Sequence, residues 1–201
     1  MRNVFKGAAI ALVVLLGVAF GGLGETRADS APAKPKEEPK ADAKKLDLPW
    51  TLDECKKAWK KGMSMKLKAT SKSGDKEEVS FTLEEITEIT EKGYKHKTTN
   101  MDAEGKVKGE PTEQEQAWED YFKGMDFTDK DTTVTEETIK VGAGEYDCKV
   151  YTQVKDENGS KSTGKCYFVK NKPGYIAKYS MEGAYGEMKF SYTMELVEVK
   201  E

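Results

Sequence analysis

The side chains that could carry out catalysis are few in this sequence. His96 is the single histidine, and it lies in the lysine- and threonine-rich stretch 95–99. A histidine-based metal site or a nucleophilic triad would have to rely on this one imidazole, and no glycine-flanked serine motif accompanies it. We therefore interpret His96 as a solvated strand residue and predict that the protein is not an enzyme.

Two other stretches superficially resemble ligand sites. Asp126, Asp129 and Asp131 are clustered like oxygen ligands for calcium, but the glycine and the final glutamate of a helix–loop–helix calcium site are missing. The glycine-containing stretch 142–144 lies between two predicted strands, whereas a phosphate-binding loop leads into a helix. We interpret the first as a solvated loop and the second as a turn, and we expect no metal and no cofactor.

The cysteines are three in number: Cys55, Cys148 and Cys166. With a hairpin loop over residues 157–159, Cys148 and Cys166 share a strand face as diagonal neighbours at roughly 7 Å, the edge of what a disulfide spans. A loop centred on Glu157 would place them directly opposite one another. We favour a Cys148–Cys166 disulfide with Cys55 free, and pairing of Cys55 with one of them is the alternative.

Residues 1–28 have the organisation of a signal peptide. Arg2 and Lys6 precede an uncharged, mainly apolar run over residues 7–24, as in the first two regions of an export signal. We predict cleavage after Ala28, with residues 21–22 as alternative sites. An uncleaved anchor would need about 20 strongly apolar residues. The sequence predicts an exported protein, periplasmic or extracellular, with no stable membrane insertion after cleavage.

Residues 29–45 are rich in proline, alanine, lysine and glutamate. Because no apolar side chain in this stretch is larger than alanine, it cannot bury enough surface to offset the entropy lost on ordering. We predict a disordered linker between the signal peptide and a single antiparallel β domain over residues 46–201.

The charge of the predicted mature chain argues against a nucleic-acid partner. The whole chain has a net charge of −3, and residues 1–28 hold three basic residues and one acidic residue, so the remainder carries −5. Arg2 and Arg27 are the only arginines. A lysine-only, acidic chain lacks the bidentate cation that grips phosphate or guanine. The same composition disfavours anionic membrane surfaces.

Alternation of apolar and polar residues predicts the fold class. Met63, Met65 and Leu67 alternate with polar residues, and residues 188–196 repeat the pattern, as expected for strands with one buried face. Turn residues at 73–75, 91–93, 156–159 and 171–174 separate such stretches. We predict a mainly β protein: a curved antiparallel meander sheet or half-barrel of about six to eight strands with one or two short covering helices.

Two stretches have helical spacing. Leu52, Cys55 and Trp59 lie on one helical face, with Thr51 or Asp53 as the cap, although a strand could already begin at Trp59. Residues 112–115 have the form of a capping box and precede an apolar helical face. The members of that face are Ala117, Trp118, Tyr121 and Phe122.

The C-terminal half resembles small exported bacterial β proteins of unknown function. The resemblance lies in ETIKVGAGEYDCKVY at 137–151, KCYFVKNKPGYIAKYS at 165–180 and GEMKFSYTMELVEV at 186–199. More distantly, the predicted meander with a covering helix is similar to the half-barrels of periplasmic lipoprotein carriers of the LolA/LolB type.

Two functions fit these features. The first is a non-catalytic module whose curved sheet binds an apolar small molecule on a methionine- and aromatic-rich face. The residues expected on this surface are Met63, Met65, Phe81, Met188, Phe190, Tyr192 and Met194. The alternative is a cell-envelope structural or protein-interaction domain with a closed core, which would contact an envelope protein through edge strands or through Tyr167, Tyr175 and Tyr179. The sequence leaves the oligomeric state open.

Overall fold

The computed structural model describes residues 43–201, except residues 124, 158, 159 and 187. The predicted signal peptide and most of the predicted linker lie outside the described residues. Among the described residues, no helix is both long enough and apolar enough to cross a membrane.

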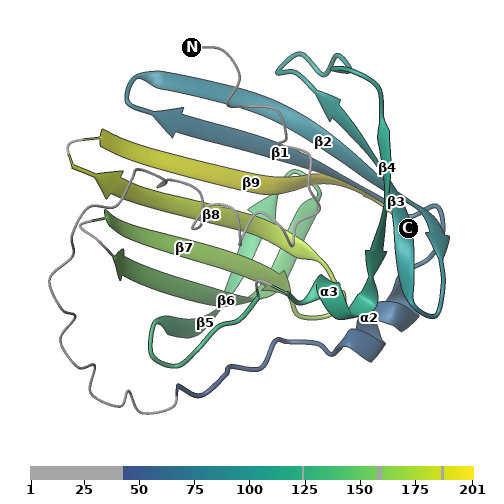
Figure 1. The fold of residues 1–201 in the computed structure, drawn as a ribbon, viewed down its shortest axis with the longest axis horizontal. Helices are drawn as coiled ribbons and strands as arrows, with labels where there is room; N and C mark the ends of the chain where they lie inside the picture. Colours follow the sequence, from purple (N-terminus) through teal and green to yellow (C-terminus); the bar gives the residue numbers. More distant parts are fainter. Residues whose placement is uncertain (1–42, 124, 158–159, 187) are drawn as a thin grey trace, which may run out of the picture.

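The described residues form one antiparallel sheet of nine strands (Figure 1). The strands are β1 (Ser64–Ser73), β2 (Lys76–Ile89), β3 (Gly93–Met101), β4 (Thr112–Ala117), β5 (Thr132–Val141), β6 (Gly144–Glu157), β7 (Ser160–Val169), β8 (Ile176–Tyr185) and β9 (Met188–Lys200). The mainly β, antiparallel prediction is confirmed, with one strand more than the upper number predicted.

The strand order is β4-β3-β2-β1-β9-β8-β7-β6-β5. Strands β1–β4 and β5–β9 are each a meander, and the two meanders are joined because the first strand pairs with the last. The sheet is open, with β4 and β5 at its edges. The single continuous meander that we expected is therefore wrong in connectivity: residues 118–131 carry the chain from one edge of the sheet to the other.

The first predicted helix is confirmed and the second is partly wrong. Helix α2 (Leu52–Ala58) has Thr51 as its N-cap, and Thr51 forms a capping box with Glu54. Helix α3 (Trp118–Tyr121) is a single turn, and the predicted capping box at 112–115 belongs to β4. Its residues pair with β3, and Glu113 and Glu115 stand opposite lysines of that strand, so favourable cross-strand pairs outweigh the local helical signal.

The segments around the two helices are fixed to one end of the sheet by side-chain hydrogen bonds. The indole nitrogen of Trp50 donates to the carbonyl oxygen of Val169 at 3.1 Å, and that of Trp59 donates to Pro173 at 3.2 Å. The hydroxyl of Tyr121 donates to the carbonyl oxygen of Gly174 at 2.9 Å. Figure 1 shows both helices near this end, and the β1–β2 and β8–β9 turns at the other.

The folded part begins slightly earlier than predicted. The backbone amide of Asp129 donates to Lys44 at 3.0 Å, the amide of Leu46 donates to Phe127 at 2.8 Å, and Lys45 forms a bridge with Thr128. The last residues of the predicted linker are therefore part of the domain.

The register between β6 and β7 differs from the predicted one. Glu157 pairs with Ser160, so Cys148 stands opposite Val169 and Tyr151 stands opposite Cys166. Two residues, not three, connect the strands, and a slip of one residue moves a side chain to the other face. Cys148 and Cys166 thus lie on opposite faces. The predicted Cys148–Cys166 disulfide is wrong: all three cysteines are free and buried.

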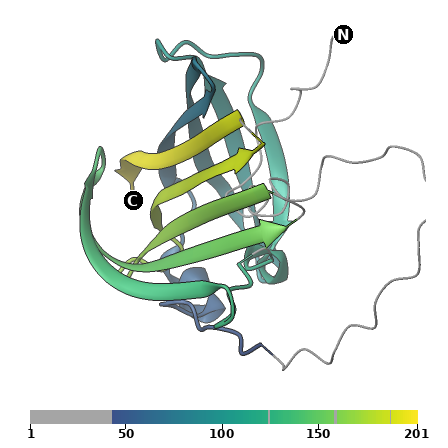
Figure 2. The same ribbon diagram turned by 90° about the vertical axis from the view of Figure 1, so that its left-hand side faces the viewer.

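The tip of the β5–β6 hairpin folds back across β9 (Figure 2). The register between β1 and β9 leaves Val197 unpaired as a bulge, and the amide of Ala143 donates to the carbonyl oxygen of Leu196 at 3.1 Å. A Cβ atom at Gly142 would lie 2.9 Å from the Cα of Val197, so glycine permits this close approach. The contact lies on the face of the sheet that bears Cys148 and Val150, which are fully buried.

Candidate functional site: the inner face of the sheet

The two faces of the sheet differ in chemistry. We call the inner face the one that bears Leu67, Met194 and Tyr179, which stand on neighbouring strands in the β1–β9 and β8–β9 registers. The outer face bears Lys68 and Glu195, which are directly opposite one another. The inner face is the continuation of the core, whereas charged residues dominate the outer face of β1–β3 and β9.

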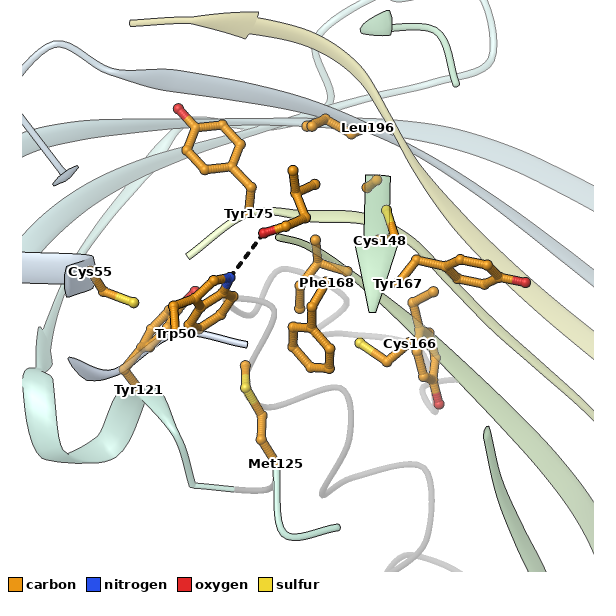
Figure 3. Close-up of a cluster of buried hydrophobic side chains, with 14 of the residues drawn as sticks. Trp50, Cys55, Tyr121, Met125, Cys148, Cys166, Tyr167, Phe168, Tyr175 and Leu196 are labelled. Carbon is orange, nitrogen blue, oxygen red and sulfur yellow. Dashed lines mark hydrogen bonds between the residues drawn. The ribbon is translucent and has the colours of Figure 1, made fainter. Parts of the chain in front are cut away.

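One end of the inner face is closed by aromatic side chains. The ring centroid of Trp59 lies 4.9 Å from that of Tyr94 and 5.1 Å from that of Tyr121. Trp50 packs edge-on against Phe168 at 5.6 Å. Figure 3 shows Trp50 and Phe168 in this cluster, with the hydrogen bond from the Trp50 indole. At this end, the inner face is packed as an ordinary hydrophobic core.

Toward the β8–β9 turn, the apolar side chains of the inner face become progressively more exposed to solvent. Met194 is buried, Tyr192, Phe190 and Met181 are half-buried, and Met188 is 60% exposed. The ring of Phe190 lies against Gly183, where a Cβ atom would come within 2.5 Å of it. The aromatic and methionine side chains of β8 and β9 therefore form a wall that runs from the core to solvent.

Small side chains lie beside this wall on β1 and β2. Ala69 and Ser71 stand opposite Met194 and Tyr192 of β9, and Ser80 and Thr82 continue the inner face on β2. We call these four residues the small-residue strip. They are exposed or half-buried, so the inner face has less side-chain volume here than over β9.

Two buried polar groups without partners lie on the same face. Tyr179, next to Met194, is 5% exposed, and its hydroxyl has no hydrogen-bond partner in the described part of the chain. Burial raises the pKa of Tyr179 to about 12. His96 is 3% exposed and neither ring nitrogen has a described partner. Such groups are costly unless something bonds to them.

The interpretation of His96 as a solvated residue is wrong. Its register partner is Ile86 on the inner face, and its ring lies 5.7 Å from that of Tyr94. Burial lowers the pKa of His96, which keeps the imidazole neutral at pH 7. A neutral imidazole offers one acceptor nitrogen and one donor N–H.

Glu84 is the acidic residue at the end of the small-residue strip. It stands opposite Met65 on β1 and opposite Thr98 on β3. In the part of the chain that the structure describes, its carboxyl group has no hydrogen-bond or ion-pair partner. Burial raises the pKa of Glu84 to about 7. The carboxyl group is therefore poised between its neutral and charged forms near neutral pH.

Most of the predicted binding residues lie on the inner face, but they do not form one cluster. Met65 is near Glu84, whereas Phe190, Tyr192 and Met188 are toward the open end, with Met194 between. Met63 is buried just before β1.

Phe81 is the predicted binding residue that the structure places on the wrong side. It pairs with Lys68 on the outer face, and the ammonium group of Lys66 lies 5.2 Å from its ring centroid. The alternation of Val79, Phe81 and Leu83 is real, but it faces away from the core. Pattern alone does not say which face of a strand is inside.

The cysteines are poorly suited to nucleophilic chemistry. Burial raises the pKa of Cys55 to about 12 and that of Cys148 to about 11, and it raises the pKa of Cys166 well above its ordinary value. Their raised pKa keeps these thiols protonated at neutral pH, whereas the thiolate is the reactive form.

The aspartates of the 126–131 loop have structural partners. Asp126 forms an ion pair with Lys45, and Asp129 accepts from the amide of Lys44 at 3.1 Å. Asp131 accepts from Thr128, Thr132 and Gln153. These bonds tie the start of the domain to the loop before β5.

Comparisons with known proteins gave few matches. No family model and no curated protein matches the chain. One matching crystal structure is a provisionally assigned exported protein with a YmcC-like fold from Bacteroides fragilis, with 11% identity, a TM-score of 0.41 and coverage of 71% of this chain and 97% of that chain. Another is a provisionally assigned lipoprotein from Parabacteroides distasonis, with 10% identity, a TM-score of 0.41 and coverage of 70% and 96%. The resemblance to small exported bacterial proteins and the likeness to LolA/LolB carriers both stay predictions.

Proposed function

We propose that this protein is an exported, non-catalytic binding protein that holds an apolar molecule on the inner face, over the small-residue strip. The observation that carries the proposal is the incomplete burial of Met181, Phe190 and Tyr192 on a face that is continuous with the core. A ligand there would extend the core over side chains that the protein itself leaves partly exposed, and the burial of its apolar surface would drive binding.

The chemistry of the reactive side chains favours binding over catalysis. The thiols are held protonated by burial, and among the described residues His96 has no oriented partner of the kind that a general base needs. By contrast, the half-exposed surface combines aromatic rings with a methionine, whose side chain adapts to ligands of irregular shape.

Native mass spectrometry followed by denaturing mass spectrometry tests this function. The full-length chain would be exported from a bacterial host and purified from the envelope fraction. We expect a reproducible excess mass that is released on denaturation as an apolar molecule, or uptake of added 1-dodecanol by the bare protein. A bare protein that takes up no dodecanol contradicts the proposal.

A matched pair of variants locates the site. Met181→Lys places a charge on the half-buried inner face, whereas Ser180→Lys places it on the adjacent outer position, beside Lys165 and Thr193. We expect Met181→Lys to lose the bound mass and Ser180→Lys to retain it. Equal retention by both variants would exclude the open end of the inner face.

A further inference from the structure

The inner face of β1–β3 is almost free of charge. The lysines of β1 and β3 point outward: Lys66 pairs with Leu83 and Lys97 with Glu85, all on the outer face. Lys95, also on that face, forms an ion pair with Glu88 at 2.6 Å. Away from the β1–β2 turn, Glu84 is the one aspartate, glutamate or lysine on the inner face of these three described strands. No described cation approaches it.

The groups around Glu84 offer hydrogen-bond acceptors. Thr98, directly opposite, is 2% exposed and contributes a hydroxyl oxygen. His96 lies two residues further along β3 on the same face, within the reach of a diagonal cross-strand neighbour. Its ring nitrogens have no described partner, and one of them accepts when the ring is neutral. A carboxylate, a hydroxyl and an imidazole therefore share one part of the inner face.

The other titratable groups near Glu84 are neutral at pH 7. Tyr94 on β3, Tyr121 of α3 and Cys55 of α2 all have a pKa raised by burial. The charge of Glu84 adds to the effect of burial in raising the pKa of both tyrosines. Within the described part of the chain, a charged Glu84 thus has no counter-charge on the elements packed around it.

The small-residue strip connects this polar group to the open end. Ser80, Thr82 and Glu84 occupy successive inner positions of β2, so Glu84 lies about 13 Å from Ser80 at the usual rise of a strand. A molecule lying along it would have an apolar chain beside Met194 and Tyr192 and one end at Glu84.

We propose that the ligand is an amphiphile with a protonated primary amine, whose ammonium group bonds to Glu84, Thr98 and His96 while its apolar chain lies along the small-residue strip. This inference rests on the proposed function. An ammonium group supplies three N–H donors to the three acceptors and provides the missing counter-charge. A fatty acid or phosphate head would instead meet a carboxylate of the same sign.

Calorimetric titration with three ligands of equal chain length tests the head-group preference. The full chain is titrated with dodecylamine, 1-dodecanol and dodecanoate, each below its micelle concentration. At pH 8 we expect dodecylamine to bind at least about 10-fold more tightly than the alcohol, as a charge-assisted hydrogen bond allows. We expect dodecanoate to bind most weakly.

Two neighbouring glutamates give a matched control. Glu84→Gln should remove the preference for the amine over the alcohol, whereas Glu85→Gln, on the outer face opposite Lys97, should keep it. Glu84→Asp retains the charge and should restore part of the preference. Circular dichroism of each variant confirms that it is folded.

The pH dependence gives an independent readout. The amine remains protonated from pH 6 to pH 8, while Glu84 loses its proton over this range, so the affinity for dodecylamine should rise with pH and that for dodecanol should not. If dodecanol binds as well as dodecylamine and Glu84→Gln has no effect, the head-group inference is overturned and the proposed function stands. If none of the three ligands binds, both are overturned.

Discussion

At the scale of the residue, Glu84 links the stability of the protein to pH. Its pKa is about 7 in the folded protein, against an ordinary value of 4.5. Because the folded-state pKa is the higher one, the contribution of Glu84 to the free energy of unfolding is fully present below about pH 4.5. That contribution is lost as the pH rises through 7. Glu84 thus weakens the fold in alkaline solution.

We predict that Glu84→Gln removes this loss. The free energy of unfolding of the variant, relative to the native sequence, should increase by about 2 kcal/mol between pH 5 and pH 8, allowing for the partial exposure of the side chain. Urea unfolding at the two pH values measures the difference. Glu85→Gln should show no such trend, and an equal trend in both variants would place the titrating group elsewhere.

At the scale of the element, the β7–β8 connection is shaped by one glycine. Gly174 has a φ of 86°, and a Cβ atom there would lie 2.2 Å from the indole nitrogen of Trp59. That indole donates to Pro173, and the hydroxyl of Tyr121 donates to Gly174 itself. Both helix-bearing segments are therefore hydrogen-bonded to this loop.

We predict that Gly174→Ala costs more stability than Gly62→Ala. Gly62 has a similar φ of 89°, but nothing lies within 4 Å of its Cβ position, so its substitution reports the backbone strain alone, about 1 kcal/mol. Gly174→Ala should add roughly 1–3 kcal/mol from the displaced indole. Chemical denaturation of both variants measures this difference, and equal losses would show that the Trp59 contact is not tight.

At the scale of the whole molecule, the two meanders are united by the pairing of β1 with β9, two strands that are far apart in sequence. Leu196 lies on this seam, opposite Leu67, and is 1% exposed. Its side chain belongs to the inner face, while its carbonyl oxygen accepts from the β5–β6 hairpin tip. One position thus contributes to the core and to the attachment of the hairpin.

We predict that Leu196→Ala destabilises the protein by about 2–5 kcal/mol, the usual range for a buried leucine. Val107→Ala, at a side chain that is 57% exposed, should change the free energy of unfolding by less than about 0.5 kcal/mol. Thermal or urea unfolding compares the two. A small effect of Leu196→Ala would mean that the two meanders are stable independently.

Local signals in the sequence were sufficient for several features. Helix α2 follows from Thr51 and the spacing of Leu52 and Cys55, because a cap and an apolar face are encoded within a few residues. The alternation in β1 and β9 likewise predicted strands, and together these signals indicated the antiparallel, mainly β class. Their causes are short-range, so a single chain segment contains them.

Features that depend on a partner strand could not be predicted from such local signals. The capping-box form at 112–115 became an edge strand because β3 was available to pair with it. The disulfide prediction failed because a one-residue change in register separates Cys148 from Cys166.

By itself the sequence determined the β class, the first helix, the alternating strands and the scarcity of catalytic groups, since each depends on residue type and local spacing. Only the tertiary structure decided that Phe81 faces outward, that His96 is buried and that Glu84 lies on the inner face without a described partner. Those properties depend on which strands become neighbours and which face receives the helices, and distant parts of the chain determine both.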